Sequence, residues 1–239
     1  MTGVQTCALP ISLARGLGIG LLVAVQSYCL YSSVAIIPVA LALLAFNTFP
    51  MLYVLLTWAA GGENPGRRAL VAMPLALLGL VLALDIVGSL QSIAGRWAEI
   101  GLGVGWALGS AASFACVLFL TTKHLQAVDG RVRTLLTMGT TAVVVGLAGA
   151  ATGSLALPAD GTGWFGLALL TVLYGSAITA IFTVVPRLKS PSNTAALNFE
   201  PIAALILGWA ILGQTVAPRQ MVGALIVVGA VILIGTKRH

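Results

Sequence analysis

Residues 194–213 read TAALNFEPIAALILGWAILG, and Glu200 is the single charged side chain in this apolar run. A helix that crosses a bilayer needs roughly 20 largely apolar residues. A charged side chain at the bilayer centre costs roughly 2.5–3.5 kcal/mol on insertion scales, and such residues usually mark functional sites. The run therefore predicts a membrane-spanning helix in which Glu200 is a candidate functional residue.

The whole chain has the composition of an integral membrane protein. Of its 239 residues, 59% are hydrophobic and 8% are charged, and the mean hydropathy is +1.06. Turns and charges divide the sequence into eight apolar stretches: 16–34, 38–58, 68–85, 98–120, 133–152, 163–184, 194–213 and 219–236. These stretches are continuously apolar and are longer than the roughly 10 residues of a barrel strand. The predicted fold is all-α, a polytopic transmembrane helix bundle with eight spans.

The net charge of +6 is explained by the positions of the basic residues. With the amino terminus in the cytoplasm, ten of the twelve fall on the cytoplasmic side: Arg15, Arg67, Arg68, Lys123, Arg131, Arg133, Arg187, Lys189, Lys237 and Arg238. Arg96 and Arg219 fall on the opposite side. This bias follows the positive-inside rule. It predicts cytoplasmic termini and contact with anionic lipid headgroups, and it leaves no basic patch for a nucleic acid.

Candidate catalytic and metal-binding groups are sparse. Cys7, Cys29 and Cys116 share no short spacing, and the two histidines, His124 and His239, stand apart. An intramembrane enzyme needs clustered Asp, His, Ser or Cys at helical spacing, and no such cluster is present in the sequence. We expect no metal, no cofactor and no enzymatic activity, with an intramembrane enzyme as the weaker alternative.

An internal repeat appears when the chain is shifted by 151 residues. The shift places Asn47 on Asn198 and Pro50 on Pro201, and positions 47–63 then contain six identities, including Trp58 on Trp209. The two copies lie in the second and seventh predicted spans, which cross the membrane in opposite directions. Inverted-topology repeats of this kind are a recurrent construction in secondary transporters.

The repeated segment suggests the residues of a translocation pathway. A proline inside an apolar helix removes one backbone hydrogen bond and frees a carbonyl one turn earlier. The asparagine three residues before each proline either lines a substrate cavity or satisfies that freed backbone, and Trp209 either stacks on substrate or anchors the helix at the membrane interface. The candidate pathway residues are Glu200, Asn198, Asn47, Pro201, Pro50 and Trp209.

Glu200 itself has two interpretations. Desolvation favours the protonated form of a carboxyl group, so Glu200 could exchange a proton during a transport cycle. Alternatively, the carboxyl group bonds to a neighbouring helix or to backbone freed near Pro201. The corresponding position of the first copy is Phe49, so any carboxylate chemistry must come from the second copy.

The run around Glu200 resembles a known family. Together with Gly223-Ala-Leu-Ile-Val-Val-Gly229, it is similar to the ninth and tenth helices of EamA-type transporters of the drug/metabolite transporter superfamily. The usual family signature is Glu-Pro within the helix and Leu-Gly-Glu at its end. Here the second element reads Leu212-Gly213-Gln214. The resemblance covers nearly the whole chain from Arg15 onward.

The resemblance implies ten spans in two five-helix repeats. Residues 15–97 then form an incomplete first repeat of three spans, and residues 98–239 form the second repeat with the cytoplasmic tail. Residues 1–14 are expected to be a non-native or disordered leader, because the string VQTCALPI at positions 4–11 resembles a translated sequencing adapter. The first two helices of the family pattern have no counterpart here, so truncation of the sequence is expected.

The function implied by the resemblance is secondary transport. We expect export of a small metabolite or drug-like compound by alternating access across a bacterial inner membrane. The alternative is a non-functional truncated fragment of such a carrier. A small-molecule substrate and membrane lipids are the expected partners, and a homodimer is left open.

Overall fold

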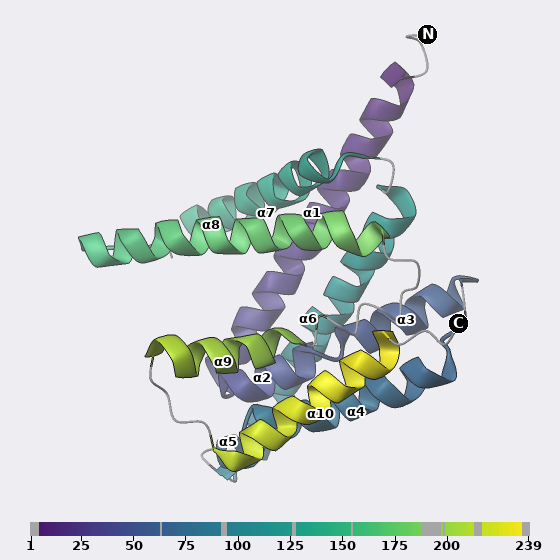
Figure 1. The fold of residues 1–239 in the computed structure, drawn as a ribbon. Helices are drawn as coiled ribbons and strands as arrows, with labels where there is room; N and C mark the ends of the chain where they lie inside the picture. The colour runs from purple at the N-terminus through teal and green to yellow at the C-terminus, as the bar shows by residue number, and fades with distance from the viewer. Residues whose placement is uncertain are drawn as a thin grey trace. The chain divides into compact units, whose positions relative to one another are not determined.

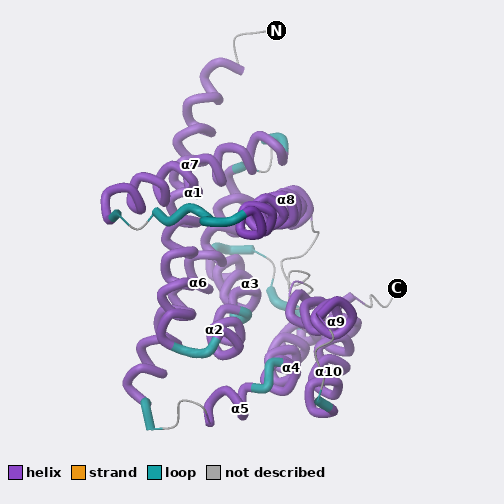
Figure 2. The backbone as a smooth tube through the Cα atoms, turned by 90° about the vertical axis from the view of Figure 1, so that its left-hand side faces the viewer, coloured by secondary structure: helices purple, strands orange, loops and turns teal. Residues whose placement is uncertain are grey.

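Every described element of the chain is a helix. The computed structural model describes residues 5–62, 64–91, 95–125, 128–153, 155–187, 197, 199–212 and 217–235, and over these residues the tube view contains only helices and loops (Figure 2). The elements, labelled in Figure 1, are α1 Gln5–Ile36, α2 Val39–Phe46, α3 Phe49–Ala59, α4 Arg67–Ala83, α5 Ile86–Gln91, α6 Trp97–His124, α7 Gly130–Thr152, α8 Gly161–Val184, the 3₁₀ helix η1 Val185–Arg187, α9 Glu200–Leu212 and α10 Pro218–Gly235. The predicted all-α class is confirmed.

Five segments are long and apolar enough to cross a membrane. They are Leu13–Ile36, Val39–Ala59, Trp97–His124, Gly130–Thr152 and Gly161–Val184, and each overlaps one predicted span. The other three predicted spans, 68–85, 194–213 and 219–236, contain the shorter helices α4, α9 and α10. The chain is an integral membrane protein, and the count of eight spans stays a prediction.

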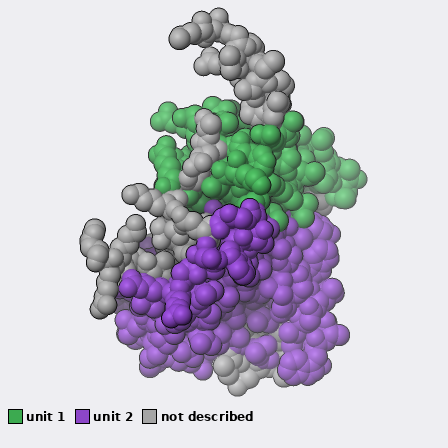
Figure 3. Space-filling view, turned by 90° about the vertical axis from the view of Figure 1, so that its right-hand side faces the viewer, with its two compact units in different colours: residues 1–25, 116–187 green, residues 26–115, 188–239 purple. Residues whose placement is uncertain are grey.

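The helices group into two compact units, coloured separately in Figure 3. Unit 1 consists of Met1–Val25 and Cys116–Arg187, and unit 2 consists of Gln26–Ala115 and Leu188–His239. The long helices α1 and α6 each contribute residues to both units. The helix that carries Glu200 belongs to unit 2.

In unit 1, α1 and α7 approach each other closely at Gly20. A β-carbon at Gly20 would lie 2.5 Å from Thr140 Cβ and 2.7 Å from the carbonyl oxygen of Thr137. The hydroxyl of Thr141 donates to the carbonyl oxygen of Gly20 at 2.9 Å. Small residues that let backbones approach, together with hydrogen bonds between helices, are the usual means of packing membrane helices.

In unit 2, the same means of packing joins α1 to α6. The amide of Gln26 donates to the Ser110 hydroxyl at 3.1 Å, and that hydroxyl donates to the carbonyl oxygen of Gln26 at 3.0 Å. Seven residues along α1, the Ser33 hydroxyl donates to the carbonyl oxygen of Gly103 at 2.8 Å. All three side chains are buried, so these polar groups are satisfied by the neighbouring helix.

Also in unit 2, α4 and α10 lie side by side with opposite chain directions (Figure 1). Gly79 and Gly223 face each other, and a β-carbon on Gly223 would lie 2.5 Å from the carbonyl oxygen of Gly79. The end of α4 is tied to the start of α10, because the Arg219 guanidinium lies 2.8 Å from Asp85 Oδ2. Because Gly79 and Gly223 have no side chains, the backbones of α4 and α10 can approach this closely.

Candidate functional site

At the predicted proline site of the first copy, a two-residue turn interrupts the apolar segment Val39–Ala59. α2 ends at Phe46 and α3 begins at Phe49, so Pro50 is the second residue of a new helix. Proline is tolerated there because the first amides of a helix have no partner inside it. The sequence predicted one helix loosened by a proline; the structure has two short helices meeting at residues 47 and 48.

Asn47 closes the end of α2. It is 4% exposed, and its side-chain amide donates to the carbonyl oxygen of Leu43 at 2.7 Å. The Thr48 hydroxyl donates to the carbonyl oxygen of Ala45 at 2.7 Å. The same two carbonyl oxygens also accept the backbone N–H groups of Asn47 and Thr48, so each side chain is a second donor at the helix end. The amide nitrogen of Asn47 therefore has the structural role, and a place for Asn47 in the pathway stays a prediction.

This role predicts the effect of removing the amide. Asn47→Ala should lower the free energy of unfolding by about 0.5–1.5 kcal/mol, because the half-buried carbonyl of Leu43 loses the side-chain amide as its second donor. Thermal unfolding of the purified protein in detergent measures the change. Thr171→Ala is the control, since the Thr171 hydroxyl bonds to Leu167 O in the same way but on an exposed surface. Equal stability of Asn47→Ala and wild type would contradict the structural role.

The position that corresponds to Glu200 is filled by an aromatic ring in the first copy. Phe49 is buried, and the centroid of its ring lies 5.2 Å from that of Phe46 and 4.9 Å from that of Phe114. The rings of Phe46 and Phe114 lie 5.7 Å apart. Aromatic rings at these separations attract each other beyond simple burial. The first copy therefore uses this position for packing.

In the second copy, Glu200 is the first residue of α9 and is exposed. A carboxylate in the first turn is favoured by the helix dipole. α3 and α9 begin at corresponding positions of the repeat, Phe49 and Glu200. Asn198 and the side chain of Pro201 lie outside what the structure describes.

One buried cluster in unit 2 includes the first turn of α9 and is contacted by α2. Leu80 and Ala83 of α4 pack with Ile202 of α9 and Val227 of α10, and Leu44 of α2 packs against this cluster. Leu44 is three residues before Asn47, and Ile202 is two residues after Glu200. The structure thus places both predicted proline sites around a shared apolar core in unit 2.

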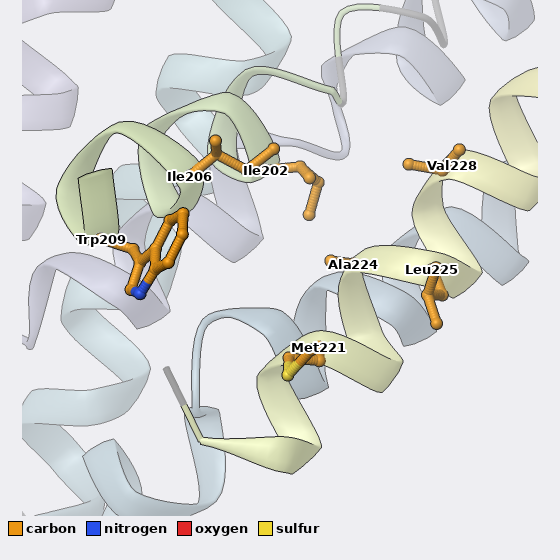
Figure 4. A pocket seen from close by; sticks show the side chains of 7 residues that line it. All are labelled: Ile202, Ile206, Trp209, Met221, Ala224, Leu225 and Val228. Atoms are coloured by element: carbon orange, nitrogen blue, oxygen red, sulfur yellow. The ribbon is translucent and has the colours of Figure 1, made fainter. Parts of the chain in front are cut away.

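An apolar cleft lies between α9 and α10. It has a volume of about 510 Å³, which is within the range of small-molecule sites. Its lining consists of Ile202, Ile206, Trp209, Met221, Ala224, Leu225 and Val228. In Figure 4 the α9 side chains stand on one side and the α10 side chains on the other. Trp209, which is 61% exposed, contributes the indole N–H, the one polar side-chain group among these seven residues.

Sequence reasoning found Trp209 but missed the opposite wall of the cleft. Met221, Ala224, Leu225 and Val228 are spaced i, i+3, i+4 and i+7, which places them on one face of a helix. That spacing was visible in the sequence. It did not show that the face lies opposite Trp209.

Comparison with known proteins identifies the family. Residues 101–236, more than half of the chain, match the EamA-like transporter family. The chain belongs to the EamA-like transporter family. The resemblance found around Glu200 and Gly223 is thereby confirmed, as are the membrane, transmembrane and transport predictions. EamA proteins are a transporter family rather than an enzyme family.

A comparison with solved structures finds a similar fold. The chain is similar to the crystal structure of a protein with which it shares 19% sequence identity, at a TM-score of 0.72. The similarity covers 94% of this chain and 75% of that one. At this level of identity it concerns the fold alone.

Proposed function

We propose that this EamA-family chain is a secondary transporter that exports a small metabolite or drug-like compound by alternating access. We place it in a bacterial inner membrane with both termini in the cytoplasm. The single observation that carries the proposal is the family match over residues 101–236. The geometry of unit 2 supports the mechanism.

The first support is the correspondence of helix starts. The shift of 151 residues carries the start of α3, Phe49, onto the start of α9, Glu200. The same shift carries the start of α4, Arg67, onto the start of α10, Pro218. Sequence identity was visible only over positions 47–63. The shared starts extend the correspondence to two consecutive helices in each copy.

The second support is the symmetry of the α4–α10 contact. Gly79 lies against Gly223, and the shift of 151 residues relates these glycines to Ala230 and Ala72. Ala72 and Ala230 also meet, in a buried cluster with Ala76. The shift of 151 residues therefore converts the Gly79–Gly223 contact into the Ala72–Ala230 contact. This is expected when two antiparallel helices are related by a two-fold axis that lies between them. This arrangement supports repeats of opposite orientation, the basis of alternating access in many transporters.

The pathway is proposed to run along α9. The cleft beside Trp209 is apolar, so it suits a substrate with an apolar or aromatic surface, and the indole ring offers a stacking face. Glu200, two residues before the cleft residue Ile202, is proposed to exchange a proton during the cycle. The helix interruptions next to this pathway, at the starts of α3 and α9, are proposed to be formed by Asn47, Pro50, Asn198 and Pro201.

Flux measurements test the proposed function. The purified full chain, reconstituted in liposomes, should show saturable uptake of at least one compound from a panel of apolar and aromatic small molecules. Trp209→Ala should lower kcat/KM about tenfold or more, since stacked aromatic contacts and their buried area are lost. Trp164→Ala is the control, because Trp164 is half-exposed and lies in unit 1. Absence of flux for the whole panel, or equal effects of the two variants, would count against the proposal.

A further inference from the structure

Unsatisfied buried polar groups gather at one place in unit 1. Among the residues that the structure describes, four buried side-chain atoms have no hydrogen-bond partner: Thr121 Oγ1, His124 Nδ1, Arg133 Nε and Arg133 Nη1. All four belong to the end of α6 or the start of α7, which are joined by residues 125–129. Buried polar atoms almost always have a partner in proteins. Their concentration at one turn indicates a missing polar occupant.

Arg133 is the centre of this group. Its residue is 3% exposed, although a guanidinium is always charged and carries five donors. The backbone of Arg133 is fully used, because its N–H donates to Asp129 O at 2.9 Å and its carbonyl accepts from the Thr137 hydroxyl at 2.9 Å. An uncompensated buried charge is strongly destabilising. The guanidinium therefore needs an anion.

In the described part of the chain, no carboxylate is paired directly with the Arg133 guanidinium. The charged groups close enough to act on Arg133 are Arg187, at the end of η1, and Asp129. Arg187 has the same sign as Arg133. Asp129 is exposed, and its carboxylate caps α7 by accepting from the backbone N–H of Arg131 at 2.8 Å. Asp129 keeps its negative charge while it caps α7, so together with Arg133 and Arg187 the local net charge is positive.

The surrounding helices enclose this end of α7. A β-carbon on Gly130, the first residue of α7, would lie 2.5 Å from the Thr183 hydroxyl of α8. Arg187, four residues after Thr183, is exposed at the end of η1 and is close enough for its charge to act on Arg133. A planar guanidinium fork matches the oxygen atoms of phosphate and can bind them with two parallel hydrogen bonds.

We propose that the end of α6, the start of α7 and Arg187 of η1 form a binding site for a phosphate group, which the buried guanidinium of Arg133 holds and the exposed Arg187 flanks. Under the proposed topology this end of unit 1 faces the cytoplasm, where anionic lipid headgroups bind basic pockets between membrane helices. The phosphate comes either from such a headgroup or from a soluble phosphate. This site is separate from the cleft beside Trp209, so neither depends on the other.

Thermal unfolding of the full chain in a neutral detergent tests the site. The probes are phosphatidylglycerol added to the micelles and, separately, inorganic phosphate. At a hundredfold excess over Kd, a binding probe should raise the Tm of the wild type by roughly 5–10 °C. Arg133→Met should abolish that rise. Without a probe, Arg133→Met should be at least as stable as the wild type, because an unpaired buried charge is removed.

Two further variants make the result decisive. Arg131→Gln removes an exposed charge from the same first turn of α7 and should retain the rise in Tm. Arg133→Lys keeps the positive charge but loses the planar guanidinium, so the Kd for the phosphate probe should become about tenfold weaker. This variant keeps the site testable if Arg133→Met does not fold. A rise with phosphatidylglycerol alone identifies a headgroup, and a rise with inorganic phosphate identifies a soluble anion. No rise with either probe, or the same rise in Arg133→Met, would overturn the proposal.

Discussion

Glu200→Gln is expected to remove the pH dependence of transport. Glutamine has nearly the same size as glutamate but cannot exchange a proton, so a flux driven by a pH gradient should fall to its level without the gradient. The variant should still insert and fold, because the change removes a charge from an apolar segment rather than adding one. Uptake into proteoliposomes with and without a pH gradient measures the effect.

Glu99→Gln is the matched control for this experiment. Glu99 is also an exposed glutamate in the first turn of a helix, but it lies outside the α9–α10 cleft and is paired with Arg96. Its replacement should leave the pH dependence of flux unchanged. If Glu200→Gln transports at the wild-type rate at every pH, proton exchange by Glu200 is wrong, and the structural interpretation of this carboxyl group remains.

Gly223→Ala is expected to force α4 and α10 apart. The added β-carbon would overlap the backbone of α4 at Ala83 N and at the carbonyl oxygen of Gly79. A backbone cannot move aside as a flexible side chain can. Overpacking of this kind costs about 1–3 kcal/mol, and a larger residue such as valine should cost more. Thermal unfolding of the purified variant in detergent measures the loss of stability.

Gly229→Ala provides the control on the same helix. No atom lies within 4 Å of a β-carbon built at Gly229, and alanine is a better helix former than glycine by roughly 1 kcal/mol. This variant should be as stable as the wild type or more stable. Equal stabilities for Gly223→Ala and Gly229→Ala would mean that the α4–α10 contact is not as close as described.

The sequence predicted the features that depend on local composition. Continuous apolar runs predicted an all-α membrane protein, and the helices confirm the class. The repeated Asn-x-x-Pro predicted disturbed helices at Pro50 and Pro201, and a helix begins beside each proline. Proline acts through its own ring and its missing N–H, so its effect could be predicted without knowledge of distant contacts.

The features that the sequence did not predict depend on which helices pack together. Gly79 and Gly223 resemble many other glycines of the chain until α4 and α10 are placed against each other. Arg133 was counted as one cytoplasmic charge among ten, because its burial arises from the packing of the helices around it. The cleft required α9 opposite the right face of α10. Periodicity gives the face of a helix but not its partner.

Opposite orientation of the two repeats is the central claim, since alternating access in this form requires it. The most direct measurement is labelling of single cysteines with a membrane-impermeant thiol reagent, in a chain whose Cys7, Cys29 and Cys116 are replaced by serine. Gly66→Cys and Ala217→Cys stand at corresponding positions, just before α4 and α10. We predict that the reagent reaches position 217 from outside the cell and position 66 only from the cytoplasmic side. Labelling of both cysteines from the same side would contradict an inverted repeat.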